Sequence, residues 1–198
     1  AELTRPEEAV EVKVATLLSL EEQQQRLRST ITLSPQAEPI QAITLRVPAG
    51  WDVTRVLVAD NTPLAFAPAI GGEPGDIRVR LAQQLPDGAS TTLTVDAESV
   101  PAEWLTDWRE QTVAFPMITV AGGTFLEGAV AVTAAGDLAV RPAELDGLIP
   151  LARREREEAG LSADEGTFAY RVVTADHDAR LTVTRRQPQL TARTFTFA

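Results

Sequence analysis

The stretch QTVAFPMITVAGGTFLEGAVAVTAAGDLAVR, residues 111–141, carries the clearest secondary-structure signal in this chain. It holds three apolar runs rich in Val, Ile, Phe and Thr, and two glycine-containing turns separate them. These residue types suit the pleated, half-buried surface of a β-sheet. The alternation changes phase at Pro116, which has no N–H for a ladder, so we expect a β-bulge or an edge position there. The stretch predicts a three-stranded meander.

Short alternating runs continue on both sides of this stretch. Val10, Val12 and Val14 alternate with polar residues near the start of the chain, and Phe168 and Tyr170 alternate near its end. Turn residues recur about every 8–12 positions, which is the spacing of a sandwich or barrel. The sequence therefore predicts an all-β, mostly antiparallel fold, and specifically a β-sandwich.

The segment PAEWLTDWRE, residues 101–110, interrupts this rhythm. Trp104 and Trp108 are four residues apart, so one helical turn would place both rings on the same side. We interpret the segment as a junction between two β halves, residues 1–100 and 111–198. The same pattern also allows the two halves to pack as a single domain.

One helix is predicted, over residues 148–160. Pro150 suits the first helical turn, and Gly160 suits the position after the last one. The middle of the segment, ARREREEA, is charged all round, so we expect the helix to lie on the surface.

The composition is that of a soluble, acidic protein. The 198 residues include 28 acidic and 18 basic side chains, a net charge of −10 that argues against a nucleic-acid partner. There is no cysteine, which excludes disulfides and sulfur ligands for metals. The longest uncharged run, residues 111–126, is too short and too interrupted for membrane insertion. Because the chain starts at Ala1 without methionine and ends within a strand-like run, we expect an excised domain or a mature fragment of a longer protein.

His177 is the only histidine, and it lies between Asp176 and Asp178. Alternate side chains on a tight turn point apart, so an exposed turn is a better interpretation than a metal site. A Ser-His-Asp triad would need this histidine, yet no Gly-x-Ser-x-Gly motif is present. The acid pairs, such as Glu103 with Asp107, sit among arginines as on a solvated surface. We therefore predict no catalytic residue, no functional metal and no cofactor.

Two interpretations of Trp104 and Trp108 remain open. They could form a stacking platform for a sugar, as in a carbohydrate-binding module. Alternatively, both rings anchor the junction segment between sheets, each burying on the order of 200 Å².

The last twenty residues carry arginines and no acid. Arg180, Arg185, Arg186 and Arg193 either protect an exposed edge strand or dock an acidic partner, such as a neighbouring domain of the parent chain.

Three further runs, LRVPAGWDV, RVRL and TLTV, begin at Leu45, Arg78 and Thr92. Together with the meander, the acidic helix and the terminal arginines, they resemble the β-rich modules of large exported or envelope-associated bacterial proteins. The resemblance implies a non-catalytic role in structure or protein interaction and an extracytoplasmic location, and it transfers no site residue. A carbohydrate-binding module is the alternative.

Overall fold

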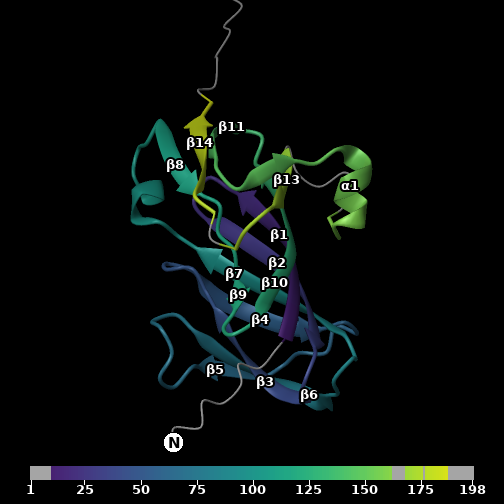
Figure 1. Cartoon of the computed structure of the whole chain (residues 1–198). Coiled ribbons are helices and arrows are strands. Elements are labelled where there is room, and N and C mark those ends of the chain that lie inside the picture. Colours follow the sequence, from purple (N-terminus) through teal and green to yellow (C-terminus); the bar gives the residue numbers. More distant parts are fainter. Residues whose placement is uncertain (1–9, 162–167, 176, 187–198) are drawn as a thin grey trace, which may run out of the picture.

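The computed structural model describes residues 10–161, 168–175 and 177–186, and almost all of its regular structure is β (Figure 1). A seven-stranded sheet has the order β12 (Leu148–Pro150), β13 (Phe168–Val172), β10 (Thr124–Ala134), β1 (Val10–Leu20), β2 (Gln25–Pro35), β7 (Thr91–Ser99) and β4 (Asp52–Val58). A four-stranded sheet has the order β5 (Phe66–Pro68), β6 (Ile77–Leu85), β3 (Ile40–Arg46) and β9 (Thr119–Val120). A three-stranded sheet contains β11 (Leu138–Leu145), β14 (Ala179–Arg185) and β8 (Glu110–Ala114). The predicted all-β, mostly antiparallel sandwich is confirmed.

The predicted meander in residues 111–141 is wrong. Its strands are distributed over all three sheets: β8 pairs with β14, β9 pairs with β3, and β10 pairs with β1 and β13. The break occurs at Pro116, as the phase change indicated. Phe115 still donates its N–H to the carbonyl of Ala179 at 3.0 Å, but Pro116 has no N–H with which to continue the ladder. The chain therefore leaves one sheet here and enters another.

The seven-stranded sheet combines strands from both ends of the sequence. It takes β1, β2, β4 and β7 from residues 1–100, and β10, β12 and β13 from residues 111–198. β1 and β10 run parallel, with Val14 opposite Gly128 and Leu18 opposite Val132. The two β halves thus share the seven-stranded sheet, whereas β11, β14 and β8 of the three-stranded sheet all follow the junction segment. The exact domain boundaries stay a prediction.

The predicted helix over residues 148–160 is wrong in extent. The α-helix α1 covers only Arg153–Glu158, and Leu148–Pro150 is an edge strand instead. Cross-strand hydrogen bonding decides this, because Val173 donates to the carbonyl of Gly147 and Leu151 donates to that of Ala169. Gly160 does follow the helix with a φ of +79°, as expected of a residue at that position.

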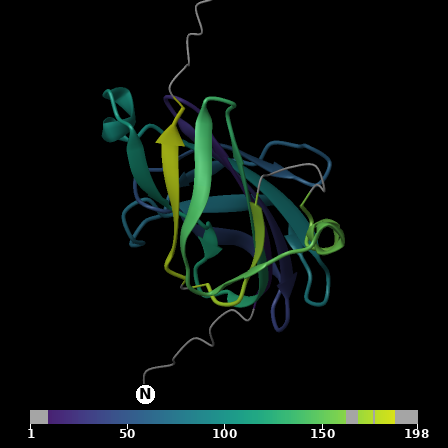
Figure 2. The same cartoon turned by 90° about the horizontal axis from the view of Figure 1, so that it is seen from above.

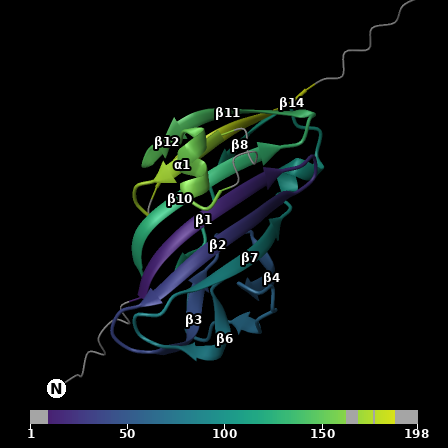
Figure 3. The same cartoon turned by 90° about the vertical axis from the view of Figure 1, so that its right-hand side faces the viewer.

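α1 covers the part of the sheet formed by β1 and β10 (Figure 3). None of its own residues is buried, but Leu151 before it and Leu161 after it pack against Ala129 and Ala131 of β10. β10 is consequently buried on both faces from Gly128 to Val132. The main core gathers side chains from all three sheets, with Leu18, Ile31 and Leu181 fully buried. Within the described part of the chain, no helix has the length and apolar character needed to cross a membrane.

Candidate functional site

Trp104 and Trp108 lie in the core. Trp104 belongs to the short 3₁₀ helix η1 (Ala102–Leu105), and its side chain is 2% exposed, while that of Trp108 is 4% exposed. Their ring centroids are 5.1 Å apart, so the two rings do lie together. One helical turn does not account for this, because η1 ends at Leu105. A platform for a sugar needs open ring faces, and this burial favours the anchor interpretation instead.

Arg185 completes the tryptophan cluster. Its guanidinium lies over the Trp108 ring, 4.6 Å from the centroid, and donates to the backbone carbonyls of Glu22 at 3.1 Å and Trp104 at 3.5 Å. The side chain is half-buried. A cation over an indole face contributes about 0.5–2 kcal/mol, depending on solvent exposure. Arg185 therefore ties the β1–β2 turn to η1 instead of projecting toward a partner.

β14 is not an edge strand, which corrects the prediction for the terminal arginines. It pairs with β11 on one side and β8 on the other, and it is the yellow strand in Figure 2. Arg180 forms ion pairs with Asp178 at 3.2 Å and Glu144 at 3.6 Å. Arg186 is exposed, and Arg193 lies outside the described residues. Docking through these arginines stays a prediction.

His177 is half-buried, not exposed as the turn pattern predicted. Both ring nitrogens are buried without a hydrogen-bond partner, and the backbone packs closely against Gly147. Asp176 lies outside the described residues. Among the described residues, no group of three or more His, Asp or Glu side chains is arranged to hold a metal ion.

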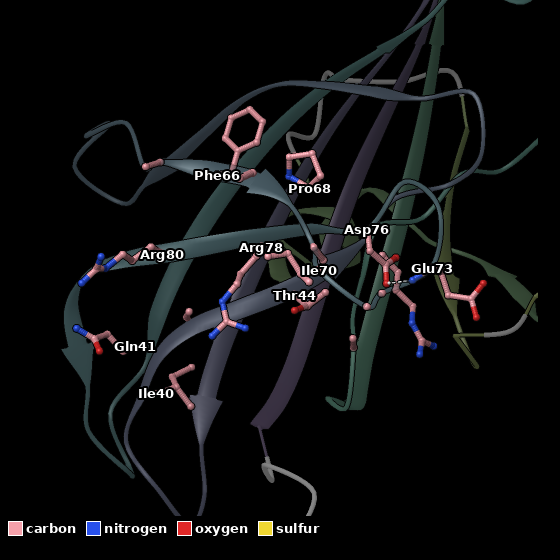
Figure 4. A pocket seen from close by; sticks show the side chains of 18 of the residues that line it. Ile40, Gln41, Thr44, Phe66, Pro68, Ile70, Glu73, Asp76, Arg78 and Arg80 are labelled. Atoms are coloured by element: carbon pink, nitrogen blue, oxygen red, sulfur yellow. Dashed lines mark hydrogen bonds between the residues drawn. The ribbon is translucent and has the colours of Figure 1, made fainter.

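A groove of about 1170 Å³ lies over the four-stranded sheet (Figure 4). Arg78 and Arg80 project from β6 on the same face, because alternate residues of a strand share a face. Ala42 and Thr44 lie directly opposite Arg80 and Arg78 on β3, and Arg46 follows two positions after Thr44.

Small side chains hollow out this face. Ala65, Ala67 and Ala69 from the β5 segment line it, together with Ala42 and Thr44 of β3. The opposite faces of the same strands carry Ile43, Leu45 and Val79, which are buried in the core. The arginines thus extend over a floor of short side chains, and a ligand has room between them.

The three arginines of the groove are exposed and form no ion pair with any residue that the structure describes. Other arginines of the chain behave differently. Arg26, Arg28, Arg55, Arg141, Arg154, Arg171 and Arg180 all contact carboxylates within 4 Å. The protein has a net charge of −10, yet three arginines without an ion pair to a described residue gather on this face. Two carboxylates, Glu73 and Asp76, also line the groove.

One end of the groove is formed by the β5–β6 loop. The Asp76 carboxylate accepts a hydrogen bond from the Glu73 N–H at 3.0 Å, shown as a dashed line in Figure 4. Asp76 N–H in turn donates to the Glu73 carbonyl at 3.0 Å. Asp76 is buried and occupied by its own loop, so it does not neutralise the arginines.

Exposed apolar residues also lie at the groove. Phe66 is 36% exposed, and Ile70 is fully exposed. In Figure 4, Phe66 and Pro68 lie on the other side of β5 from Arg78 and Arg80.

Local sequence patterns agree with the placement of two of these arginines, but they do not indicate a groove. The run of Ile77, Val79 and Leu81 predicts outward-facing Arg78 and Arg80, and the Gly71–Gly72 turn is where the loop begins. Arg46 could not be assigned to the same site, because only the pairing of β3 with β6 brings it there.

No family model matches the chain, and no curated protein matches it. Solved structures do resemble it. They include an M1 zinc metallopeptidase from Deinococcus radiodurans, with 13% sequence identity and a TM-score of 0.51. A mutant of that enzyme bound to a Tyr-Ser-Ala substrate matches with the same identity and TM-score. In both cases the likeness covers 89% of this chain but only 42% of the metallopeptidase chain. At this level of identity the likeness shows the fold alone, namely a β domain.

Proposed function

We propose that this chain is a non-catalytic structural and protein-interaction β-sandwich module of a longer bacterial protein, and that its arginine groove docks an acidic protein surface. The arginine groove is defined by Arg46, Arg78 and Arg80. The observation that carries the proposal is the gathering of these three arginines, which form no ion pair with a described residue, on one hollow sheet face of an otherwise acidic molecule.

The chemistry of arginine supports a carboxylate partner. A guanidinium offers planar, forked N–H donors that match a carboxylate with two parallel hydrogen bonds. The net charge of −10 opposes the approach of a long polyanion such as a nucleic acid, while a short acidic segment would reach the groove locally.

The solved structures support a modular context. In the metallopeptidase the matching β region is part of a chain more than twice as long as the aligned share. An acidic partner for the groove would accordingly be a neighbouring domain of a parent chain, or a second protein. Neither a catalytic step nor a metal forms part of this proposal.

The proposal is tested by fluorescence anisotropy with three labelled peptides of equal length. One peptide is acidic, one is neutral and one is basic. We expect the acidic peptide to bind about tenfold more tightly than the other two at low salt, and to weaken as salt is added. Arg78→Ser combined with Arg80→Ser should remove this preference.

A matched control removes the same two charges elsewhere. Arg141→Ser combined with Arg154→Ser alters side chains that are 68% and 91% exposed and already paired with acids. This variant should keep its affinity for the acidic peptide. The proposal is overturned if all three peptides bind alike, or if the control loses as much affinity as the groove variant.

A further inference from the structure

We infer that the arginine groove recognises an extended peptide with carboxylates at every second residue, laid across the face of the four-stranded sheet and bound by side chains. This inference rests on the proposed function, since it specifies the partner of the same groove. It adds the conformation of the partner, the spacing of its charges and the way in which it binds.

The spacing follows from strand geometry. Arg78 and Arg80 are two residues apart on β6, so they repeat at roughly 6.6–6.8 Å along the strand. On the neighbouring strand β3, Thr44 lies opposite Arg78, and Arg46 lies two positions further along. Arg46 therefore adds a third guanidinium beyond Arg78, in the direction that leads away from Arg80. An extended peptide has the same two-residue repeat, and its alternate side chains point the same way. A segment of the form Asp-x-Asp-x-Asp therefore presents one carboxylate to each guanidinium.

The small side chains of the floor permit this approach. Alanines at positions 42, 65 and 67 leave the arginines standing clear of the sheet surface. Longer side chains there would fill the space between the guanidiniums or pair with them. A contiguous run of acids fits less well, because neighbouring carboxylates of an extended chain point to opposite sides.

The alternative mode, in which the peptide adds a strand at the free edge of β5, is opposed by Pro68. Arg80 N–H donates to the Ala65 carbonyl and Ala69 N–H donates to the Asp76 carbonyl, so these alternate residues face β6. The backbone groups of Phe66 and Pro68 consequently point toward the free edge. Proline has no N–H, so an added strand would lack a ladder hydrogen bond at this position. The peptide lies on the face instead.

Two peptide isomers test the spacing at constant composition and charge. One is Ser-Asp-Ser-Asp-Ser-Asp-Ser and the other is Ser-Ser-Asp-Asp-Asp-Ser-Ser, each labelled for anisotropy. We expect the alternating isomer to bind at least about fivefold more tightly, a difference typical of one well-placed charge pair. Arg46→Ser should weaken the three-aspartate alternating peptide and leave a two-aspartate peptide, Asp-Ser-Asp, nearly unaffected.

Three further measurements separate the outcomes. The double variant Arg78→Glu, Arg80→Glu should bind a peptide that has lysine in place of each aspartate of the alternating isomer. The variant Pro68→Val should bind the alternating aspartate isomer with unchanged affinity. Equal binding of the two isomers overturns this inference but leaves the proposed docking of an acidic partner intact. Equal binding of the acidic, neutral and basic peptides overturns both the inference and the proposed function. A tenfold gain on Pro68→Val would show strand addition. Binding of a short oligothymidine as tight as that of the alternating peptide would point to a nucleic acid.

Discussion

At the scale of single residues, Trp104 and Trp108 carry the largest apolar surface in the junction segment. Each is at least 96% buried, given exposures of 2% and 4%. Replacing either one with alanine should lower the free energy of unfolding by about 3–5 kcal/mol, because a large cavity and unfilled contacts remain. Urea unfolding of each variant, followed by far-UV circular dichroism, measures this loss.

Leu105 supplies the control for the tryptophans. It follows Trp104 directly and is 66% exposed, so Leu105→Ala should change stability by no more than about 0.5 kcal/mol. If both tryptophan variants instead stayed within about 1 kcal/mol of the parent, the anchor interpretation would be wrong. Retention of the parent on a polysaccharide gel would then become the next measurement, since the carbohydrate-binding alternative would gain support.

Asp96 is the carboxylate with the strongest arginine contacts in the described chain. Its side chain is 16% exposed and accepts hydrogen bonds from Arg28 Nε at 2.8 Å and Arg55 Nη2 at 2.6 Å. Burial alone would raise the pKa of Asp96, but the hydrogen bonds and charges of the two arginines outweigh it and hold the pKa below its ordinary value. A depressed pKa stabilises the fold above the unfolded value, near pH 4, and this contribution is lost as pH falls through the folded value.

Asp96→Asn should therefore cost about 1 kcal/mol at pH 7, the upper range for exposed ion pairs. The difference in unfolding free energy between parent and variant should shrink as the pH is lowered from about 4 toward 2. Urea titrations at a series of pH values measure this difference. If the difference in unfolding free energy between parent and variant stayed constant down to pH 2, ionisation of Asp96 would not contribute to stability.

At the scale of elements, β10 is the strand that tolerates least change. It pairs with β1 on one side and β13 on the other, and Gly128 lies opposite Val14 of β1 and Val172 of β13. A Cβ on Gly128 would lie 2.6 Å from Phe125 Cζ and 3.0 Å from Val172 Cβ. Gly128→Ala should lower stability by about 1–3 kcal/mol, the usual cost of overpacking.

Gly136→Ala is the comparison for Gly128→Ala. A Cβ there meets no atom within 4 Å, and the residue lies just beyond the same strand. This variant should be neutral or slightly stabilising, because alanine restricts the unfolded chain more than glycine does. Thermal melts of both variants under one buffer condition give the answer. Equal melting temperatures would mean that Phe125 moves aside without cost.

At the scale of the whole molecule, the seven-stranded sheet joins both β halves. β1, from the first half, has β2 as one neighbour and needs β10, from the second half, as its other neighbour. We therefore expect one cooperative unfolding transition, with coincident midpoints by tryptophan fluorescence and far-UV circular dichroism.

A fragment of residues 1–100 provides the contrasting case. It retains Trp51 but lacks β10, so it should show no cooperative transition of its own. Two separated midpoints in the intact chain, or a folded fragment, would establish two independent domains. Both outcomes are read from the same urea titration.

The sequence by itself determined which residues face inward and which face water along most strands. Val10, Val12 and Val14 are buried, and Arg78 and Arg80 are exposed, as their alternation predicts. This succeeds because the two-residue period of a strand is a local property of the backbone. The all-β class follows from the same pattern, repeated between turn residues.

Only the tertiary structure decided which strands pair. A strand shows the same alternation of apolar and polar residues whichever strand it pairs with. Nothing in the local sequence therefore directs β1 to pair with β10, or places β8, β9 and β10 in three different sheets. Nor could the sequence show that Leu148–Pro150 would extend along β13, that β14 would lie between two neighbours, or that Arg46 would join Arg78. Strand pairing depends on long-range hydrogen bonds and shared burial. These contacts join segments far apart in the chain, and a local pattern does not encode them.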